Sequence, residues 1–287
     1  MPELPEVEIV RKSLSKNIKG KVITKVEVNN RNLRVKIEKK FEEKLKKKKI
    51  KKIDRFSKYI IIVFFDNSFC LIHLGMSGTI HLLKKKNKNK FTNTSFYHSP
   101  HLPKKHNHVE IELQNISLIY NDPRRFGYLL YFDNKKQLQK KFKSYGPEPF
   151  SKKFNLEYIL KYFQNKHKNI KNFLLDQKFV SGLGNIYASE VLFESKIYPL
   201  KSASLLTNDQ LKKIINYSKK VLKRSIAKGG SSIRDFKNTT GVQGSFQKEF
   251  KVYNREHLKC TRRSCGGIIK KIIISNRSSF FCNICQK

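Results

Sequence analysis

The 287-residue sequence has little negative charge, few cysteines and no long apolar run. Its 22 aspartates and glutamates stand against 62 lysines and arginines, which gives a formal net charge of +40 at pH 7. The longest apolar stretches, such as residues 59–65, have the length of a β-strand, well short of the roughly 18 residues that a membrane span needs. We also recognise no basic, apolar and small-residue leader. We therefore expect a cytoplasmic protein with neither a signal peptide nor a membrane span.

The five cysteines are too few for a disulfide framework in a chain of this length. One of them, Cys70, stands alone in an apolar stretch, where we expect it to be part of the core. The other four lie near the end as Cys260-x4-Cys265-x16-Cys282-x2-Cys285. Four thiolates in two such knuckles are typical of a closed, structural Zn²⁺ site. The flanking residues alternate as in a β-hairpin, which predicts a zinc ribbon with one structural Zn²⁺.

The excess of positive charge favours a polyanionic partner, because a compact chain with this charge repels itself unless a polyanion such as nucleic acid neutralises it. However, 50 of the 62 basic residues are lysine and only 12 are arginine. Asn, Ile and Phe are also frequent, as in a chain encoded by AT-rich codons, which would place lysine on any surface. The bulk charge therefore leaves DNA binding open. The positions of the arginines are more informative, since a guanidinium holds phosphate bidentately.

Local patterns predict a β-rich first half, with a helix expected over residues 5–18. Short β runs follow with turn residues between them, which favours a β-sandwich or barrel over a parallel sheet. These runs are 22–28, 59–65, 69–74, 79–83, 108–113, 116–120 and 128–132. The polar, Pro-containing segment 84–107 is predicted to be a long loop.

The second half is predicted to be helical. A Gly/Pro-marked boundary at residues 144–153 precedes four stretches with helical spacing, and Thr207 with Gln210 forms a capping box before the last one. The four stretches are 156–163, 170–177, 186–194 and 207–228. We expect an N-terminal β-sandwich domain at 2–133, a linker at 134–150, a helical domain at 151–245 and the ribbon at 251–287. No interface stripe stands out, so we expect a monomer.

Six blocks of sequence occur together in one order along the chain. They are MPELPEVE (1–8), RFSKYI (55–60), HLGMSG (73–78), NDPRRFG (121–127), GLGNIYASE (182–190) and the terminal cysteines. Together they resemble formamidopyrimidine-DNA glycosylase, the bacterial enzyme that removes 8-oxoguanine and ring-opened purines from DNA. The resemblance implies an α+β, multidomain fold: an N-terminal β-sandwich with flanking helices, a helix–two-turn–helix DNA-binding domain and a C-terminal Cys₄ zinc ribbon. It also implies a bifunctional glycosylase and abasic-site lyase of base excision repair, with damaged double-stranded DNA as partner.

The chemistry explains the first residues of the chain. Pro5 and Glu6 suit a helix start, but a helix start does not account for Pro2 and Glu3. A base must leave the stack before its glycosidic bond can be attacked. If Met1 is removed, Pro2 is an α-amine, which titrates near 8 against about 10.4 for lysine and is therefore a better nucleophile at neutral pH. Its iminium would permit β- and then δ-elimination, and Glu3 would shuttle protons. The family assigns both residues the same roles.

The resemblance assigns two further catalytic residues. Lys58 would donate the proton in β-elimination, with Ser57 in place of the usual small residue before it; without the resemblance, Lys58 would be a lysine at the edge of a strand. Arg277 would grip phosphate and assist the second elimination. As a ribbon arginine alone, it would be a phosphate contact.

The resemblance also implies residues that bind DNA. Arg124 and Phe126 of NDPRRFG would enter the duplex with Met76 and fill the vacated space, since a guanidinium can satisfy the orphaned cytosine and a ring can wedge a base step. The alternative is a tight turn with Phe126 in the core. Three more residues match phosphate-contacting positions, and the last of them would begin a helix whose N-terminus binds anions. They are His106, Lys166, placed at a helix start, and Asn185.

The sequence departs from the family pattern in three places. Four residues instead of two separate the first cysteine pair. Asn254, His257 and Lys259 replace customary glycines and a proline before the ribbon, and Ser245 replaces a common tyrosine in the loop over the extruded base. The sequence therefore constrains which lesion the protein prefers less than it constrains the reaction that the protein catalyses.

Three other functions compete with this interpretation. An endonuclease VIII type glycosylase for oxidised pyrimidines shares Pro2, Glu3 and the ribbon, but Leu4 and the intact DPRRFG block favour the purine enzyme. A non-catalytic zinc-ribbon DNA-binding protein would use Pro2 and Glu3 only to start a helix. A ribosome-associated ribbon protein would explain the charge and the cysteines but not DPRRFG.

Overall fold

The structure is a computed structural model that describes residues 2–84, 90–93, 104–231 and 244–287. It divides into two compact units. The N-terminal unit comprises residues 1–143 and 226–247, and the C-terminal unit comprises residues 144–225 and 248–287. Most of the expected loop 84–107, and most of the segment predicted to cover an extruded base, lie outside the described residues.

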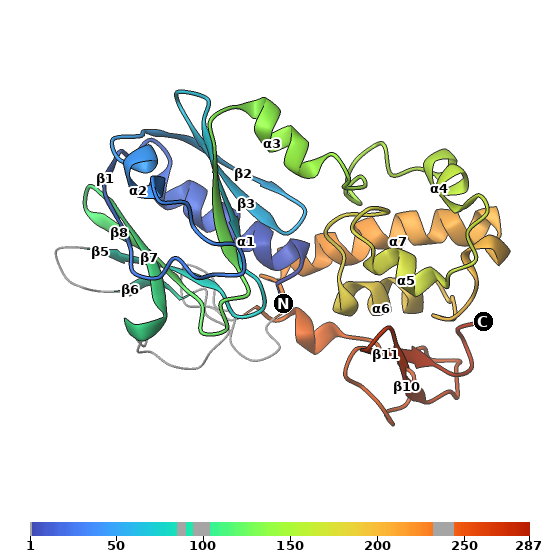
Figure 1. The fold of residues 1–287 in the computed structure, drawn as a ribbon. Helices are drawn as coiled ribbons and strands as arrows, with labels where there is room; N and C mark the ends of the chain where they lie inside the picture. Colours follow the sequence, from blue (N-terminus) through green and yellow to red (C-terminus); the bar gives the residue numbers. More distant parts are fainter. Residues whose placement is uncertain (1, 85–89, 94–103, 232–243) are drawn as a thin grey trace. The chain divides into compact units, whose positions relative to one another are not determined.

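The N-terminal unit contains two antiparallel sheets (Figure 1). The five-stranded sheet has the order β1 (Ile23–Val28), β7 (Asn107–Leu113), β8 (Ile116–Asn121), β5 (Thr79–Lys84) and β6 (Lys90–Asn93). The four-stranded sheet has the order β2 (Ile50–Phe56), β3 (Tyr59–Phe64), β4 (Phe69–His73) and β9 (Tyr128–Phe132). The predicted β-sandwich is confirmed.

The core of this unit lies between the sheets and the first helix, α1 (Leu4–Ile18). Val7, Val10 and Leu14 recur at helical spacing and are at most 1% exposed, so one face of α1 packs on the sheets. Cys70 belongs to the same core, as predicted, and burial raises its pKa to about 12. That thiol is therefore protonated and unreactive at neutral pH.

One strand and two helices of the N-terminal unit were not predicted from sequence, in addition to β6 and the 3₁₀ turn Lys104–His106 inside the expected loop. Strand β2 was not predicted because the exposed Lys51 and Lys52 stand between the inward-facing Ile50 and Ile53 and obscure the apolar pattern of the strand. Lysine is characteristic of edge strands, where charge blocks pairing with other chains, and β2 is an edge of its sheet. The other two are helices α2 (Phe41–Leu45) and α3 (Lys135–Phe142), the latter within the expected linker.

The C-terminal unit carries the predicted helices. They are α4 (Leu156–Phe163), α5 (Ile170–Leu175), α6 (Asn185–Glu194) and α7 (Asn208–Ala227), whose last two residues belong to the N-terminal unit. The capping box of α7 is confirmed: the Gln210 N–H donates to Thr207 Oγ1 at 3.3 Å, and the Thr207 N–H donates to Gln210 Oε1 at 3.2 Å.

The ribbon hairpin, β10 (Ile269–Ile274) and β11 (Arg277–Cys282), packs against α6 within the same unit (Figure 1). Phe193 of α6 shares a small core with Val252, Ile269 and Phe280. Glu190, also on α6, accepts three backbone N–H groups from residues 251–253 at 2.8–3.0 Å. The ribbon is therefore anchored to the helices and is not an independent appendage. No helix of the described residues is long and apolar enough to cross a membrane.

Candidate functional site

Pro2 and Glu3 stand at the start of α1 and are both buried, Glu3 with 3% exposure. The Glu3 N–H donates to Glu6 Oε2 at 3.0 Å. The other oxygen of Glu6 accepts the N–H and the hydroxyl of Ser231 at 2.8 and 2.9 Å. Chain ends usually fray unless something ties them down. Here Glu6 holds the first residues in place, a role that the helix-dipole argument did not reveal.

Lys58 occupies the two-residue turn between β2 and β3 and is only 6% exposed. The residue before it, Ser57, has a φ of 54°, a left-handed conformation that the turn requires. The Arg55 guanidinium donates to the Ser57 carbonyl at 2.9 Å and to Glu8 Oε2 of α1 at 3.0 Å. A buried amine in a braced turn differs from a solvated lysine at a strand edge. The turn that carries Lys58 is thus fastened to the first turns of α1.

His73 pairs with Tyr59 across β3 and β4, one residue beyond Lys58, and starts the HLGMSG block. Burial, together with the nearby positive charge of Lys58, lowers the pKa of His73 to about 4. The imidazole is therefore neutral at pH 7. Its Nδ1 accepts the Gly75 N–H at 3.2 Å, and its ring stacks on Tyr128 with centroids 5.2 Å apart.

Asp122 joins the HLGMSG and NDPRRFG blocks. Its side chain is fully buried and accepts hydrogen bonds from the Ser77 hydroxyl, from the Gly127 N–H at 2.8 Å and from the Tyr120 hydroxyl at 3.1 Å. Ser77 Oγ in turn accepts the Arg124 N–H at 3.2 Å. A buried carboxylate with several donors fixes the backbone around it. Asp122 therefore holds both loops in one geometry.

Three of the side chains predicted to contact DNA, Met76, Arg124 and Phe126, are exposed on these two loops. Met76 is 44% exposed and Phe126 is 43% exposed, which is high for large apolar residues. The Arg124 guanidinium lies 4.5 Å from the centroid of the Phe126 ring. A Cβ on Gly75 would come within 2.4 Å of the Gly127 backbone, so only glycine allows the loops this close. The alternative with Phe126 in the core is wrong.

His106 lies on the same scaffold, at the end of the 3₁₀ turn Lys104–His106. Its carbonyl accepts the Asp122 N–H at 3.1 Å. The imidazole is half-buried, and burial together with Lys105 lowers its pKa.

In the C-terminal unit, Asn185 is the first residue of α6, as the motif predicted. Its Nδ2 donates to the carbonyl of Ser278 at 2.8 Å. Arg277 is exposed at the start of β11, directly after the two turn residues Ser275 and Asn276, whose φ values of 47° and 58° fit a type I′ hairpin turn. In the described part of the chain no carboxylate pairs with Arg277. The structure thus brings Asn185 and the Arg277 hairpin together.

Lys166 differs slightly from its expected place. It lies in the connection after α4, four residues before α5 begins at Ile170, and not in the first turn of a helix. Its Nζ is 3.5 Å from the centroid of the Tyr162 ring, and the side chain is exposed.

The four cysteines of the ribbon converge as predicted. Their sulfur atoms all lie within 4.8 Å of one another, with Cys260–Cys285 at 3.9 Å and Cys265–Cys282 at 3.5 Å. Four thiolates around a tetrahedral Zn²⁺ would be about 3.8 Å apart. Burial opposes ionisation of Cys282, but the N–H groups of residues 285 and 284 lower its pKa to about 7, whereas burial raises the pKa of Cys260 and of Cys285. The cluster can hold a metal ion.

The longer first knuckle closes through local hydrogen bonds. The Cys265 N–H donates to the Arg262 carbonyl at 3.0 Å, and the Cys260 N–H donates to the Gly267 carbonyl at 2.8 Å. A Cβ on Gly267 would approach the Cys282 sulfur to 2.6 Å. Glycine at this position therefore makes room for the sulfur cluster despite the two extra residues.

Asn254 and His257, which replace customary glycines, keep the conformation that glycine favours. Their φ values are 56° and 67°, in the left-handed region that other residues adopt at a cost. The backbone path into the ribbon is thus preserved although its glycines are lost.

The residues that hold the predicted site residues in place were not themselves predicted from the sequence. Glu6, Glu8, Arg55 and Asp122 all lie inside the blocks quoted above, so the blocks drew attention to the right segments. Their partners could not be read from the sequence, since each bonds a residue from another block or from beyond the blocks.

Comparison with known proteins agrees with this geometry. The profile of the formamidopyrimidine-DNA glycosylase N-terminal domain matches residues 1–129, and that of the formamidopyrimidine-DNA glycosylase H2TH domain matches residues 145–237. Among curated proteins, the formamidopyrimidine-DNA glycosylase of Legionella pneumophila is 38% identical over 287 residues, covering 100% of this chain and 98% of that protein. The one from Roseobacter denitrificans is 39% identical over 289 residues, with 100% of both chains covered.

Two solved structures illustrate the likeness in three dimensions. A Lactococcus lactis Fpg mutant in complex with Fapy-dG containing DNA superposes with a TM-score of 0.85 at 33% identity, with 100% of both chains covered. The complex of Lactococcus lactis Fpg with abasic-site DNA also reaches 0.85 at 33% identity, with 99% of both chains covered.

Proposed function

Because the chain belongs to the formamidopyrimidine-DNA glycosylase family, we propose that it excises oxidised purines from duplex DNA and nicks the strand at the resulting abasic site. The observation that carries this is the exposed group of Met76, Arg124 and Phe126 on the buried Asp122. Large apolar side chains that are held rigidly at the surface are suited to insert between stacked bases, because a flexible side chain would be displaced by the stack. The named relatives, and a neighbour bound to DNA with a ring-opened purine, support the same substrate class.

Pro2 is the nucleophile in this proposal. With Met1 removed, its secondary amine attacks C1′ of the extruded nucleotide, a C–N bond forms and the bond to the base breaks. The sugar ring then opens: the C1′–O4′ bond breaks, O4′ takes up a proton and C1′ forms an iminium with the proline nitrogen. The iminium withdraws electrons, so a proton leaves C2′ and the 3′ phosphate departs, and loss of a proton from C4′ then expels the 5′ phosphate. Glu3 accepts and returns protons at the sugar. Lys58, in its braced turn, donates the proton of the β-elimination step.

Arg277 and Asn185 bind the phosphate backbone in this proposal. The exposed guanidinium of Arg277 can hold a phosphate bidentately and assist its departure in the second elimination. The hydrogen bond from Asn185 to Ser278 sets the position of the neighbouring Arg277. His106 and Lys166 add further phosphate contacts, which position the duplex without reading its sequence.

Arg124 and Phe126 fill the space left by the flipped base together with Met76. The stacking of the guanidinium on the Phe126 ring at 4.5 Å orients its donors. From that position Arg124 can satisfy the cytosine that has lost its partner.

We propose that the cysteine cluster binds one structural Zn²⁺. The sulfur separations fit a tetrahedral ion, and an all-thiolate set is closed to substrate. The ion would hold the hairpin that carries Arg277. In this assignment residues 2–133 form the catalytic β-sandwich domain, residues 151–245 the helix–two-turn–helix domain and residues 251–287 the ribbon, joined by a linker at 134–150. The bacterial relatives and the DNA substrate support a cytoplasmic protein bound to the chromosome, and we propose that it acts as a monomer.

Borohydride trapping tests the proposal. The protein is mixed with a duplex carrying 8-oxoguanine opposite cytosine and, separately, with a dihydrouracil duplex, and Pro2→Gly is the matched variant. We expect an adduct on the first duplex that maps to Pro2 and disappears in Pro2→Gly while binding survives. An adduct only on dihydrouracil would assign the chain to the oxidised-pyrimidine enzymes. Absence of any adduct, with Met1 removed and zinc bound, would indicate a DNA-binding protein without this chemistry.

A further inference from the structure

A pocket of about 440 Å³ opens on the outer face of the four-stranded sheet, between the strands and α3. It lies wholly within the N-terminal unit, and none of the residues assigned above to catalysis or DNA binding lines it. Its size falls in the range of about 300–1,000 Å³ that is usual for sites that enclose a ligand or side chain.

The floor of the pocket is apolar because β3 is apolar on both faces. Ile60 and Ile62 point into the core, whereas the alternating Ile61 and Val63 line the pocket. Strands that are apolar on both faces normally have both faces covered. Here the cover is α3, an eight-residue helix of which only Leu138 is buried. The helix is too small to fill the outer face, and the pocket is the space that remains.

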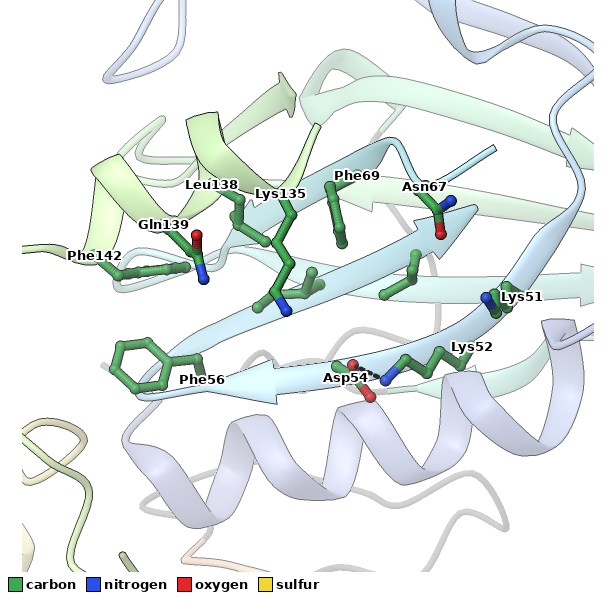
Figure 2. Close-up of a pocket in the computed structure, with 12 residues that line it drawn as sticks. Lys51, Lys52, Asp54, Phe56, Asn67, Phe69, Lys135, Leu138, Gln139 and Phe142 are labelled. Atoms are coloured by element: carbon green, nitrogen blue, oxygen red, sulfur yellow. Dashed lines mark ion pairs between the residues drawn. The ribbon is translucent and has the colours of Figure 1, made fainter. Parts of the chain in front are cut away.

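Aromatic rings close one end of the pocket. Figure 2 shows Phe56 and Phe142 facing each other there, and their ring centroids are 4.7 Å apart. Phe69 adds a third ring to the lining. Such an end favours an aromatic guest, because rings gain from edge-to-face contacts beyond simple burial.

The rim of the pocket is positively charged. Lys51 and Lys52 stand at the end opposite the aromatic pair, and Lys135 reaches down from α3 (Figure 2). Asp54, the acidic residue of the lining, is paired with Lys52 at 2.7 Å. Neither Lys51 nor Lys135 has a carboxylate partner among the residues that the structure describes. The rim therefore offers two ammonium groups to an anionic ligand.

We propose that this pocket binds a short acidic peptide segment of a partner protein, with one aromatic or large aliphatic side chain inserted on the apolar floor and flanking carboxylates at Lys51 and Lys135. Aromatic anchors in preformed pockets carry most of the energy of many protein interfaces. The pairing of opposite charges, here lysines with carboxylates, determines which partner is bound. Duplex DNA matches the rim but has no side chain for the floor. A small-molecule site would show several convergent polar groups inside the pocket, whereas Asn67 and Gln139 are the two uncharged polar residues of this lining.

Tryptophan fluorescence gives a direct test, since the chain contains no tryptophan. The probe is a blocked octapeptide, Glu-Asp-Gly-Trp-Leu-Gly-Asp-Glu, titrated with the full-length protein. Insertion on the floor shifts the indole emission to the blue, whereas adsorption to the positively charged surface does not. Two comparison peptides separate the contribution of charge from that of the inserted side chain. In the first, every carboxylate is replaced by its amide. The second has serine in place of tryptophan and leucine and is used as a competitor of the fluorescent peptide.

Variants with matched controls locate the site. Lys51→Glu/Lys135→Glu reverses the rim, and Lys36→Glu/Lys39→Glu makes the same charge change at exposed lysines outside the pocket. Gln139→Phe fills the pocket from α3, and Gln137→Phe places the same ring on an α3 residue that does not line it. Circular dichroism of each variant establishes that the fold is retained.

We expect saturable binding with a blue shift, weakened at least tenfold in Lys51→Glu/Lys135→Glu and in Gln139→Phe and unchanged in both controls. Strand cleavage should be unchanged in all four variants. Three results would each overturn the proposal: binding without a blue shift, an equal loss in the two charge-reversed pairs, or unaltered binding in Gln139→Phe.

Discussion

Ser77 and Asp122 are separated by 45 positions in the sequence and share a buried hydrogen bond. Through this bond the turn that carries Met76 and the loop that carries Arg124 and Phe126 form one rigid surface feature. The same carboxylate accepts the Gly127 N–H at 2.8 Å, so the far end of the loop is fixed as well.

Replacing Asp122 should therefore impair both stability and DNA insertion. Asp122→Ala leaves three buried donors without an acceptor, and we expect a loss of about 3 kcal/mol in the free energy of unfolding. Asp122→Asn should lower the free energy of unfolding by less. The asparagine side chain keeps one carbonyl oxygen as an acceptor, and the Ser77 hydroxyl can accept a hydrogen bond from the amide instead of donating one. Urea unfolding and base-flipping fluorescence of 2-aminopurine beside the lesion measure the two effects. Equal values for the two variants would contradict the proposed network.

The ion pair between Arg55 and Glu8, at 3.0 Å, should support the elimination step. Glu8→Gln loosens the turn that positions Lys58, and small displacements of a catalytic group are costly. We expect β-elimination on a preformed abasic site to slow by roughly tenfold, with DNA affinity retained. Arg11→Gln is the matched control, because Arg11 also pairs with Glu8 but does not contact the turn. Single-turnover cleavage distinguishes them, and a similar slowing in both would refute a positioning role for Arg55.

His73 should make the N-terminal unit sensitive to acid. Its pKa is about 4 in the folded protein against an ordinary value of 6.5, so the unfolded chain binds the proton more tightly. The contribution of His73 to the free energy of unfolding is fully present above pH 6.5. As the pH is lowered from 6.5 toward 4, this contribution falls by up to about 1.4 kcal/mol per pH unit. Urea midpoints from pH 7.5 to 4.5 should fall less steeply in His73→Phe. Parallel curves would show that His73 does not contribute.

Loss of one cysteine should remove the metal. In Cys282→Ser we expect bound zinc, measured by mass spectrometry, to fall from one ion per chain to a small fraction, with weaker DNA binding as the ribbon hairpin loosens. Cys70→Ala is the control, because that thiol lies in the other core and should leave the zinc content unchanged. Full zinc occupancy in Cys282→Ser would exclude the assigned ligand set.

Glycine at His257 should stabilise the protein. The φ of 67° costs a histidine about 1–2 kcal/mol, part of which is offset by the greater freedom of glycine when unfolded. We expect His257→Gly to gain up to about 1 kcal/mol, and Asn254→Gly to gain less because asparagine tolerates this conformation. Lys259→Gly, where φ is not positive, should be destabilising. Thermal unfolding of the zinc-bound protein gives the three values, and a loss in His257→Gly would contradict the argument.

Much of the fold was predictable because its signals are local. Helix α4 has the bounds predicted from apolar spacing, and seven of the nine strands of the N-terminal unit were expected within two residues. Strand β2 was missed, since exposed lysines on one face obscure a short alternation. Helix α3 was missed for a similar reason: Leu138 is its one buried residue, so it has almost no apolar period.

By itself, the sequence determined which segments are proposed to form the site and what chemistry they would bring. Residue type and spacing pointed to Pro2 and Glu3 as a reactive pair and to the four cysteines as metal ligands, because reactivity and metal geometry depend on a few side chains close together in the chain. Arg124 and Phe126 were singled out by the resemblance to the family, and the sequence left open whether Phe126 is exposed.

Only the tertiary structure decided how those segments are held. Ser77 with Asp122, Arg55 with Glu8 and Asn185 with Ser278 are single polar contacts between distant or separately folded segments. Such contacts leave no periodic trace in the sequence, and their partners become neighbours only when the core has brought the strands and helices together.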